Sequence, residues 1–279
     1  MGEYRNPNEE PIPVGKGTKK AGCQPPPEEF VSALPVFSTH VEPLDWKWLE
    51  RMAKSPANVG RTIFDSSFII NQGRYGSCNG CAGAMALTRA RIRRGLSRVD
   101  LSGTDLYAQV NGNRDNGSML DDGMQSITKR GVATLAKVPL TKIYRRQYDA
   151  KAADREARKY KAFECYRCVE LADLWTALAL GWDCVVVVHA GSSFSRLDSN
   201  GVSGVNRGRG NHAVAADGLL WAGGEIVADA YNSWGKSWGH RGRMLLTAEH
   251  FKQTIGVHSF YAIRSSTDSE DNPIPKPKR

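Results

Sequence analysis

The sequence contains no long apolar segment. None of its stretches approaches the roughly 18 consecutive apolar residues of a membrane-spanning helix. Residues 1–6 are polar and acidic, whereas a secretory signal peptide starts with basic residues and continues with an apolar stretch. A myristoylation signal is missing as well, because Asn6 stands where Ser or Thr is required. We therefore expect no membrane partner, no export by a classical signal peptide, and a location in the cytoplasm.

A recognised nucleic-acid-binding motif is also missing. The formal net charge is +9, which would attract nucleic acid or acidic partners. The basic residues, however, gather in short runs such as 89–98 and the tail at 276–279. Runs of this kind usually form solvated faces. We therefore expect no specific nucleic-acid partner.

The remaining composition is that of a globular protein. Of 279 residues, 41% are hydrophobic and 24% are charged, so the chain can bury a sizeable core. The first part differs, because it carries Pro25–Pro27 and shows no apolar periodicity before a short amphipathic stretch at 41–60. We expect an extended arm over 1–60, a folded domain over 61–265 and a flexible basic tail over 266–279.

Helical patterns precede strand patterns along the folded domain. Apolar residues recur at helical spacing over 78–95 and 171–181, and a capping pattern at Ser118 predicts another helix. Strand patterns follow at 184–189, 212–221, 225–231, 242–247 and 258–264. This order predicts an α+β fold, with a helical half at about 61–160 and an antiparallel sheet at about 161–265.

Cys78, His212 and Asn232 have the chemistry of a thiol nucleophile site. A cysteine attacks a carbonyl carbon only as the thiolate, and a nearby histidine commonly supplies the base. A third group, often Asp or Asn, must hold that histidine in one tautomer, and Asn232 follows the His212 strand. The helix expected to begin at Cys78 would place the sulfur at the positive end of the helix dipole, which favours the thiolate.

Three motifs surround these residues. Gln-Gly-Arg-Tyr-Gly-Ser-Cys spans 72–78, Asn-His-Ala-Val spans 211–214, and Asn-Ser-Trp-Gly-Lys-Ser-Trp-Gly spans 232–239. Cys78 and His212 are 134 residues apart (212 − 78), inside the roughly 130–150 interval of papain-type enzymes. On these motifs, residues 65–265 resemble the papain-like cysteine peptidases. The resemblance implies a two-lobed papain-like fold with the active site in the cleft between a helical lobe and a sheet lobe.

The resemblance also implies a role for each residue. Cys78 would be the nucleophile, His212 the general base and acid, and Asn232 the orienting residue. Gln72 would complete the oxyanion hole beside the backbone N–H of Cys78, and Trp234 would shield the His–Asn hydrogen bond from water. Supporting or substrate-binding positions beside them are Gly76, Ser77, Asn79 and Asn211. No metal and no organic cofactor is required.

The sequence departs from the family at two positions next to the nucleophile. Familiar members carry a Trp after the nucleophile and a half-cystine three residues before it, whereas this chain has Asn79 and Tyr75. Loss of the half-cystine fits a reducing compartment. The stretch from Asp115 to Ser118 resembles the branch found in bacteria and their phages, so a virion-associated location is expected as the alternative to the cytoplasm.

These observations predict a cysteine-type peptidase that acts on a protein or peptide substrate. Residues 1–60 are short and Pro-rich for the helical inhibitory prodomain of secreted relatives, so zymogen control is not evident and an arm that docks onto a partner protein fits as well. A structural or assembly protein of virion type, with little or no activity, is the alternative from another class. Acyl transfer or isopeptide cleavage on the same residues is a third.

Other residues have competing interpretations. Four thiols in two Cys-x-x-Cys pairs, Cys78/Cys81 and Cys165/Cys168, are formally enough for a structural zinc site, but that reading leaves the three motifs unexplained. Cys81 is more simply a core residue. Asp217 and Asp229 are possible orienting residues for the histidine, although structural roles at strand ends suit them better.

Overall fold

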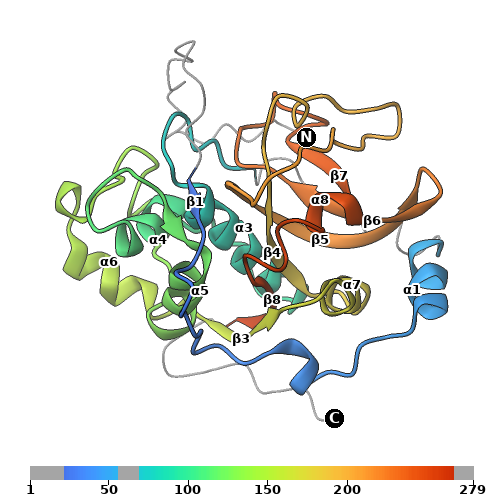
Figure 1. The fold of residues 1–279 in the computed structure, drawn as a ribbon. Coiled ribbons are helices and arrows are strands. Elements are labelled where there is room, and N and C mark those ends of the chain that lie inside the picture. Colours follow the sequence, from blue (N-terminus) through green and yellow to red (C-terminus); the bar gives the residue numbers. More distant parts are fainter. Residues whose placement is uncertain (1–21, 56–68, 267–279) are drawn as a thin grey trace.

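A six-stranded sheet carries the C-terminal half of the chain. The structure is a computed structural model that describes residues 22–55 and 69–266 (Figure 1). The strands run in the order β3-β8-β4-β5-β6-β7, and every neighbouring pair is antiparallel. Their bounds are Ala162–Cys168 (β3), Asp183–Val188 (β4), Arg243–Thr247 (β7), Phe260–Ser266 (β8), His212–Ala222 (β5) and Glu225–Tyr231 (β6). All six residues of β4 are buried, as its continuous apolar run predicts for a strand covered on both faces.

Helices fill the other half and cover the sheet. Their bounds are Trp46–Ala53 (α1), Cys78–Arg93 (α3), Gly103–Val110 (α4), Leu120–Lys129 (α5), Ala150–Ala157 (α6), Leu171–Ala179 (α7) and Ala248–Phe251 (α8). In Figure 1, α4, α5 and α6 gather on one side, strands β5 to β7 lie on the other, and α3 runs between them. Helix α3 can approach α4 closely because Gly80 has no side chain. A Cβ at that position would lie only 2.2 Å from the carbonyl oxygen of Gly103.

The α+β architecture confirms the sequence prediction, with helices first and antiparallel strands after. Strand β3 and helix α4 were not predicted. The helix predicted after Ser118 is confirmed as α5, but its N-cap is Met119 and not Ser118, which belongs to the short strand β2, Ser118–Met119. A two-residue strand holds Ser118 because its backbone pairs with a distant segment, which a local sequence pattern does not reveal.

That distant segment is the described part of the arm. Strand β1, Cys23–Gln24, pairs in parallel with β2. The chain then passes beside α5 and β3 to a short 3-10 helix, Phe37–Thr39, and on to α1 (Figure 1). Phe37 is fully buried with its ring centroid 5.2 Å from that of Trp182. Residues 22–53 thus follow an extended course but pack against their own chain, and α1 lies in the predicted amphipathic stretch. Residues 1–21 and 267–279, which include the predicted basic tail, lie outside the described residues.

The run of arginines on α3 forms ion pairs with the sheet. Arg89 Nη2 lies 2.8 Å from Asp217 Oδ2, and Arg93 Nε lies 3.0 Å from Asp183 Oδ2. The interpretation of residues 89–98 as a solvated face is therefore wrong for these two side chains, and Arg91 is fully buried as well. A run of basic residues on a helix can equally supply the opposite charges for buried acidic residues on another element.

The same network extends into the last strands of the sheet. Arg243, on β7, donates to Asp217 over 3.2 Å and to Asp229 over 3.1 Å. Both aspartates are buried, so each is held by a guanidinium group in the interior. These contacts favour the structural reading of Asp217 and Asp229 over a role in orienting the histidine.

We expect Asp217→Ala to destabilise the protein by about 3–5 kcal/mol, because it leaves buried guanidinium groups without their acidic partner. Urea unfolding followed by fluorescence measures the loss. Asp100→Ala is the matched control, since it removes a half-exposed pairing with Arg98 and should change stability by about 1 kcal/mol or less. Equal losses in the two variants would contradict the structural importance of the network.

Candidate active site

Cys78 is the first residue of α3 and is fully buried. The loop before it is fixed to the sheet half of the protein, because the backbone N–H of Gln72 donates to the carbonyl oxygen of Ser233 over 2.8 Å. Gly73 adopts a φ of 60°, which a residue with a side chain rarely takes, and so allows the chain to turn into the helix. The sulfur therefore sits at a helix N-terminus, as the sequence predicts.

His212 and Asn232 are joined by a hydrogen bond. His212 is the first residue of β5, and Asn232 directly follows β6. Because β5 and β6 are antiparallel neighbours, the start of one lies beside the end of the other. His212 Nε2 lies 2.7 Å from Asn232 Oδ1, and that oxygen also accepts from the backbone N–H of Ser233 over 2.8 Å. An amide oxygen can only accept, so Nε2 carries the proton.

The start of β5 also reaches the sulfur of Cys78. The backbone N–H groups of Ala213, Asn79 and Gly22 are directed at this sulfur and lower the pKa of the thiol. Burial has the larger effect and raises the pKa of Cys78 to about 11. Since Ala213 follows His212, the structure brings the element that carries the histidine to the element that carries the thiol.

Aromatic rings surround the histidine. The Trp234 ring lies 4.8 Å from the His212 ring at an interplanar angle of 34°, and Phe194 meets the same imidazole edge-on at 6.0 Å. Trp238 stacks on Phe194 at 5.6 Å. Phe194, which is fully buried, was not singled out in the sequence. The signal that could have revealed it is a single large apolar residue within a loop of serines and glycines.

The side chain of Gln72 is held at both ends. Its Nε2 donates to the carbonyl oxygen of Tyr75 over 2.7 Å, and its Oε1 accepts from the hydroxyl of Ser233. An amide nitrogen carries two N–H groups, and only one is needed for the bond to Tyr75. The side chain is also buried, so its orientation is fixed before any substrate arrives.

The predicted supporting residues divide between the two halves of the site. The backbone N–H of Gly76 donates to Asp115 Oδ1 over 2.9 Å, and the Ser77 hydroxyl lies 3.7 Å from the sulfur of Cys81. Asn79 donates through Nδ2 to the hydroxyl of Ser118 over 2.9 Å, so its side chain ties α3 to β2. Asn211 Oδ1 accepts from the backbone of Ala190 over 2.8 Å, and its carbonyl oxygen accepts from the arm.

The arm passes directly over the thiol. The backbone N–H groups of Gly22 and Cys23 donate to the carbonyl oxygen of Asn211 over 3.2 and 3.0 Å, and Ser118 donates to the carbonyl oxygen of Gly22 over 2.9 Å. A Cβ at Gly22 would lie 2.2 Å from the carbonyl oxygen of Gly76. The segment thus fills the space between the two halves and buries Cys78. These contacts are made with its own chain, and a separate docking partner stays a prediction.

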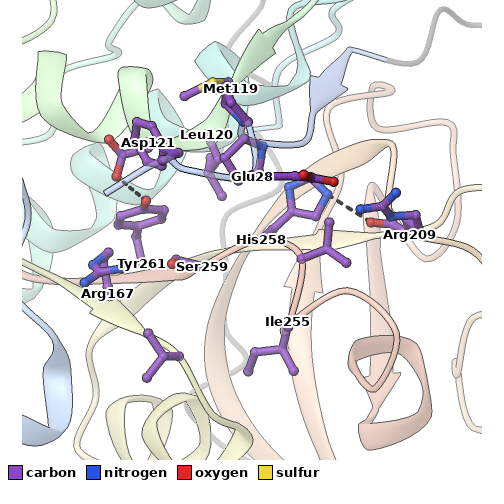
Figure 2. Close-up of a pocket in the computed structure, with 16 residues that line it drawn as sticks. Glu28, Met119, Leu120, Asp121, Arg167, Arg209, Ile255, His258, Ser259 and Tyr261 are labelled. Carbon is purple, nitrogen blue, oxygen red and sulfur yellow. Dashed lines mark hydrogen bonds between the residues drawn. The ribbon is translucent and has the colours of Figure 1, made fainter. Parts of the chain in front are cut away.

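A cavity of about 410 Å³ continues from this point along the arm. Figure 2 shows His258 on the segment that leads into β8, with its ring directed toward Arg209. His258 Nε2 lies 2.9 Å from the carbonyl oxygen of Arg209, and Nδ1 lies 4.0 Å from the sulfur of Cys23. The sequence did not single out His258, because nothing in its local pattern shows that the arm would reach it.

The two Cys-x-x-Cys pairs lie on different elements of the structure. Cys78 and Cys81 lie on α3, whereas Cys165 and Cys168 lie on β3, and all four are free and buried. Cys81 is a core residue, as expected. Within residues 22–55 and 69–266 there is no group of three or more His, Cys, Asp or Glu side chains that could hold a metal ion. Nor is any helix among them long and apolar enough to span a bilayer.

Comparisons with known proteins agree with this architecture. Xylellain, a cysteine protease from Xylella fastidiosa, superposes with a TM-score of 0.62 at 23% identity, over 90% of this chain and 98% of that one. The proform of the ragweed pollen allergen Amb a 11, a cysteine protease, gives a TM-score of 0.59 at 22% identity, over 87% and 70% of the two chains. The cysteine protease and lectin-like domains of Cwp84 from Clostridium difficile give 0.64 at 17% identity, over 91% and 57%. At these identities the likeness shows the fold.

The sequence itself carries the family assignment. No curated protein matches the chain. None of the three structures above comes from a phage, so the phage branch stays a prediction. A family model described as papain family cysteine protease matches residues 64–263, which is most of the chain. The chain therefore belongs to the papain family of cysteine proteases and is a cysteine-type peptidase.

Proposed function

We propose that the protein hydrolyses peptide bonds through Cys78, His212 and Asn232, with Gln72 in the oxyanion hole. The observation that carries the proposal is the hydrogen bond from His212 Nε2 to Asn232 Oδ1, 2.7 Å long, at the strand whose next backbone N–H meets the sulfur of Cys78. In this arrangement Nε2 donates to Asn232, so Nδ1 is the nitrogen that would exchange a proton with the thiol and with the substrate.

The reaction would proceed in two steps. His212 Nδ1 first takes the thiol proton of Cys78. The resulting thiolate attacks the carbonyl carbon of the peptide bond, and the carbonyl electrons move to the oxygen. When the C–N bond breaks, His212 gives its proton to the leaving amine, and an acyl-thioester remains on Cys78. His212 then takes a proton from water, whose oxygen attacks the thioester, and the carboxylic acid product and the thiol are released.

The surrounding groups would each contribute to these steps. Asn232 holds the imidazole in one tautomer, and the rings of Trp234 and Phe194 keep water from the His–Asn hydrogen bond. The backbone N–H of Cys78 and the side-chain amide of Gln72 would receive the oxyanion. Donors of this kind are each typically worth ~2.7–4 kcal/mol in the transition state.

The backbone groups that bind the arm indicate the class of substrate. The carbonyl oxygen of Asn211 and the N–H of Ser118 hold an extended peptide backbone on its two sides. An extended segment of a protein or peptide substrate can use the same groups once the arm has left. In the described conformation the arm occupies these groups, so a substrate backbone cannot bind to them. The described conformation is therefore a latent form.

No observation favours a purely structural role, or acyl transfer, over hydrolysis. A scaffold would not need the bonds that fix Gln72, His212 and Asn232 in place. The cytoplasmic or virion-associated location is a proposal that depends on the sequence alone.

We expect Gly22→Val to open the site. Its Cβ would meet the Gly76 carbonyl oxygen at 2.2 Å, and backbone cannot yield cheaply, so the segment must leave the cleft. Exposure should lower the pKa of Cys78 from about 11 toward the ordinary value of about 8.5, which raises the thiolate fraction at pH 8 by up to about 200-fold. Because thiolate forms as pH rises through the pKa, the midpoint of the rate profile moves to lower pH. Iodoacetamide labelling mapped by mass spectrometry measures both effects.

Val31→Ala is the control for this variant, because Val31 lies on the arm but is 85% exposed. It should label like the wild type. If Gly22→Val also labels Cys78 at the wild-type rate and midpoint, the arm does not limit access to the thiol.

The proposed mechanism is tested in the Gly22→Val background with a fluorogenic peptide library. Cys78→Ser should abolish hydrolysis, and His212→Ala should lower kcat by about 10²–10⁴-fold, the usual contribution of general acid–base catalysis. His189→Ala serves as the matched control, since this histidine is outside the proposed mechanism. Hydrolysis that survives Cys78→Ser, or equal effects of the two histidine variants, would remove the basis of the proposal.

Gln72→Ala should lower kcat by about 10²–10³-fold with little change in the labelling rate of Cys78, because an alkylation passes through no oxyanion. Ser233→Ala retains the amide of Gln72 but removes the hydroxyl that orients it, so an intermediate loss is expected. Steady-state kinetics and iodoacetamide labelling on the same preparations check both variants. A parallel fall in labelling and kcat would instead indicate a disturbed thiol.

A further inference from the structure

A chain of hydrogen bonds connects the two loops that border the thiol. Asp115 Oδ1 accepts from the backbone N–H of Gly76 and from the hydroxyl of Tyr107, each over 2.9 Å. The Tyr107 hydroxyl in turn accepts from the backbone N–H of Gly117 over 3.0 Å. We call these three bonds among Gly76, Asp115, Tyr107 and Gly117 the clasp. It joins the loop that leads into α3 to the loop that leads into β2.

The two loops lie side by side against the extended backbone of the arm. A Cβ at Gly22 would meet the carbonyl oxygen of Gly76 at 2.2 Å, and a Cβ at Gly117 would meet the carbonyl oxygen of Gly22 at 2.4 Å. Gly76 and Gly117 are themselves neighbours, because a Cβ at Gly76 would lie 3.2 Å from the backbone nitrogen of Gly117, and Gly22 packs against both. Because the clasp bonds both glycines to one pair of side chains, it fixes the placement of the two loops relative to each other.

The loop is tied again on the other side of the nucleophile. Asn79 Nδ2 donates to the hydroxyl of Ser118 and to the carbonyl oxygen of Met119. Residues 76 and 79, two before and one after Cys78, are therefore both bonded to the segment 115–119. The backbone N–H of Cys78, which would donate to the oxyanion, lies between these two bonded residues.

No disulfide supplies this connection. Tyr75 stands where familiar members of the family carry a half-cystine, and the cysteines of the described residues are free. Burial raises the pKa of the Tyr107 hydroxyl, so the group stays protonated and continues to donate to Asp115 throughout the neutral range. The hydrogen bonds of the clasp are short and are buried or half-buried. They lie close to the loop that a disulfide would hold.

We propose that Asp115 and Tyr107 are positioning residues of the peptidase site, which fix the Cys78 backbone N–H relative to the strand that receives the substrate backbone. The inference rests on the proposed hydrolytic function. It assigns Asp115 mainly to the oxyanion side, through Gly76, and Tyr107 mainly to the substrate side, through Gly117. Loss of the first contact should act on kcat, and loss of the second should act on KM.

The test compares three substitutions in the Gly22→Val background. Asp115→Ala removes the acceptor and should lower kcat by about 100-fold, the effect of misplacing reacting groups by about an ångström. Asp115→Asn keeps an oxygen that can accept both bonds, so its kcat should stay close to that of the parent. Tyr107→Phe loses one hydroxyl and should raise KM by about fivefold. Iodoacetamide labelling of Cys78, which uses no oxyanion hole, should remain unchanged in all three.

Hydrogen exchange of the peptides that cover 72–80 is the second readout and needs no activity. Asp115→Ala should speed exchange there, and Asp115→Asn should restore protection. If the Gly22→Val parent cleaves no peptide, the proposed function fails, and the exchange data still decide whether the clasp holds the loop. Unchanged exchange in Asp115→Ala, or an Asn variant as impaired as the Ala variant, overturns the proposal.

Discussion

The two halves of the proposed active site lie on different elements, and the buried ion pairs between α3 and the sheet hold them together. Cys78 begins α3, His212 begins β5, and the arginines of α3 bond to aspartates at the sheet. Burial raises the pKa of Asp183 to about 7, with the arginines opposing it, so desolvation offsets much of the attraction. Such a network adds little net stability but penalises every misalignment, because a shifted helix would leave buried charges unpaired. Its main consequence is that it fixes the position of the thiol relative to the imidazole.

The sequence predicted the parts of this site that local chemistry determines. The motifs around Cys78, His212 and Asn232 located their elements, and the structure joins the last two by the predicted hydrogen bond. The sequence did not reveal contacts between segments that lie far apart in the chain. The acidic partners of Arg89 lie more than 90 residues away, at Asp183 and Asp217, so the basic run looked like a solvated face. Strand β3 was not predicted for a similar reason. It has no continuous apolar run, and it forms by pairing with the distant strand β8.

The arm illustrates the same limit and has the larger consequence for function. Its prolines predicted an extended segment, and it is extended, but nothing in its composition says which surface it covers. The deciding feature is Gly22, whose backbone packs closely against Gly76 and Gly117 because the residue has no side chain. The contacts are backbone hydrogen bonds to Asn211 and Ser118. A peptide substrate would need the same groups, so arm and substrate compete for one site.

Competition of this kind also explains how one thiol among several can be selective. Burial raises the pKa of every cysteine in the described residues, including Cys81 to about 12. Cys81 lies inside the packed interface of α3, where no movement of the arm would expose it. The burial of Cys78 is different, because part of it is contributed by a segment held through a few backbone bonds. When that segment leaves, desolvation falls, whereas the N–H groups of Ala213 and Asn79 remain directed at the sulfur. Release of the arm would therefore both uncover this thiol and make it more acidic, and the proposed role of the clasp is to keep the oxyanion donor in place while this happens.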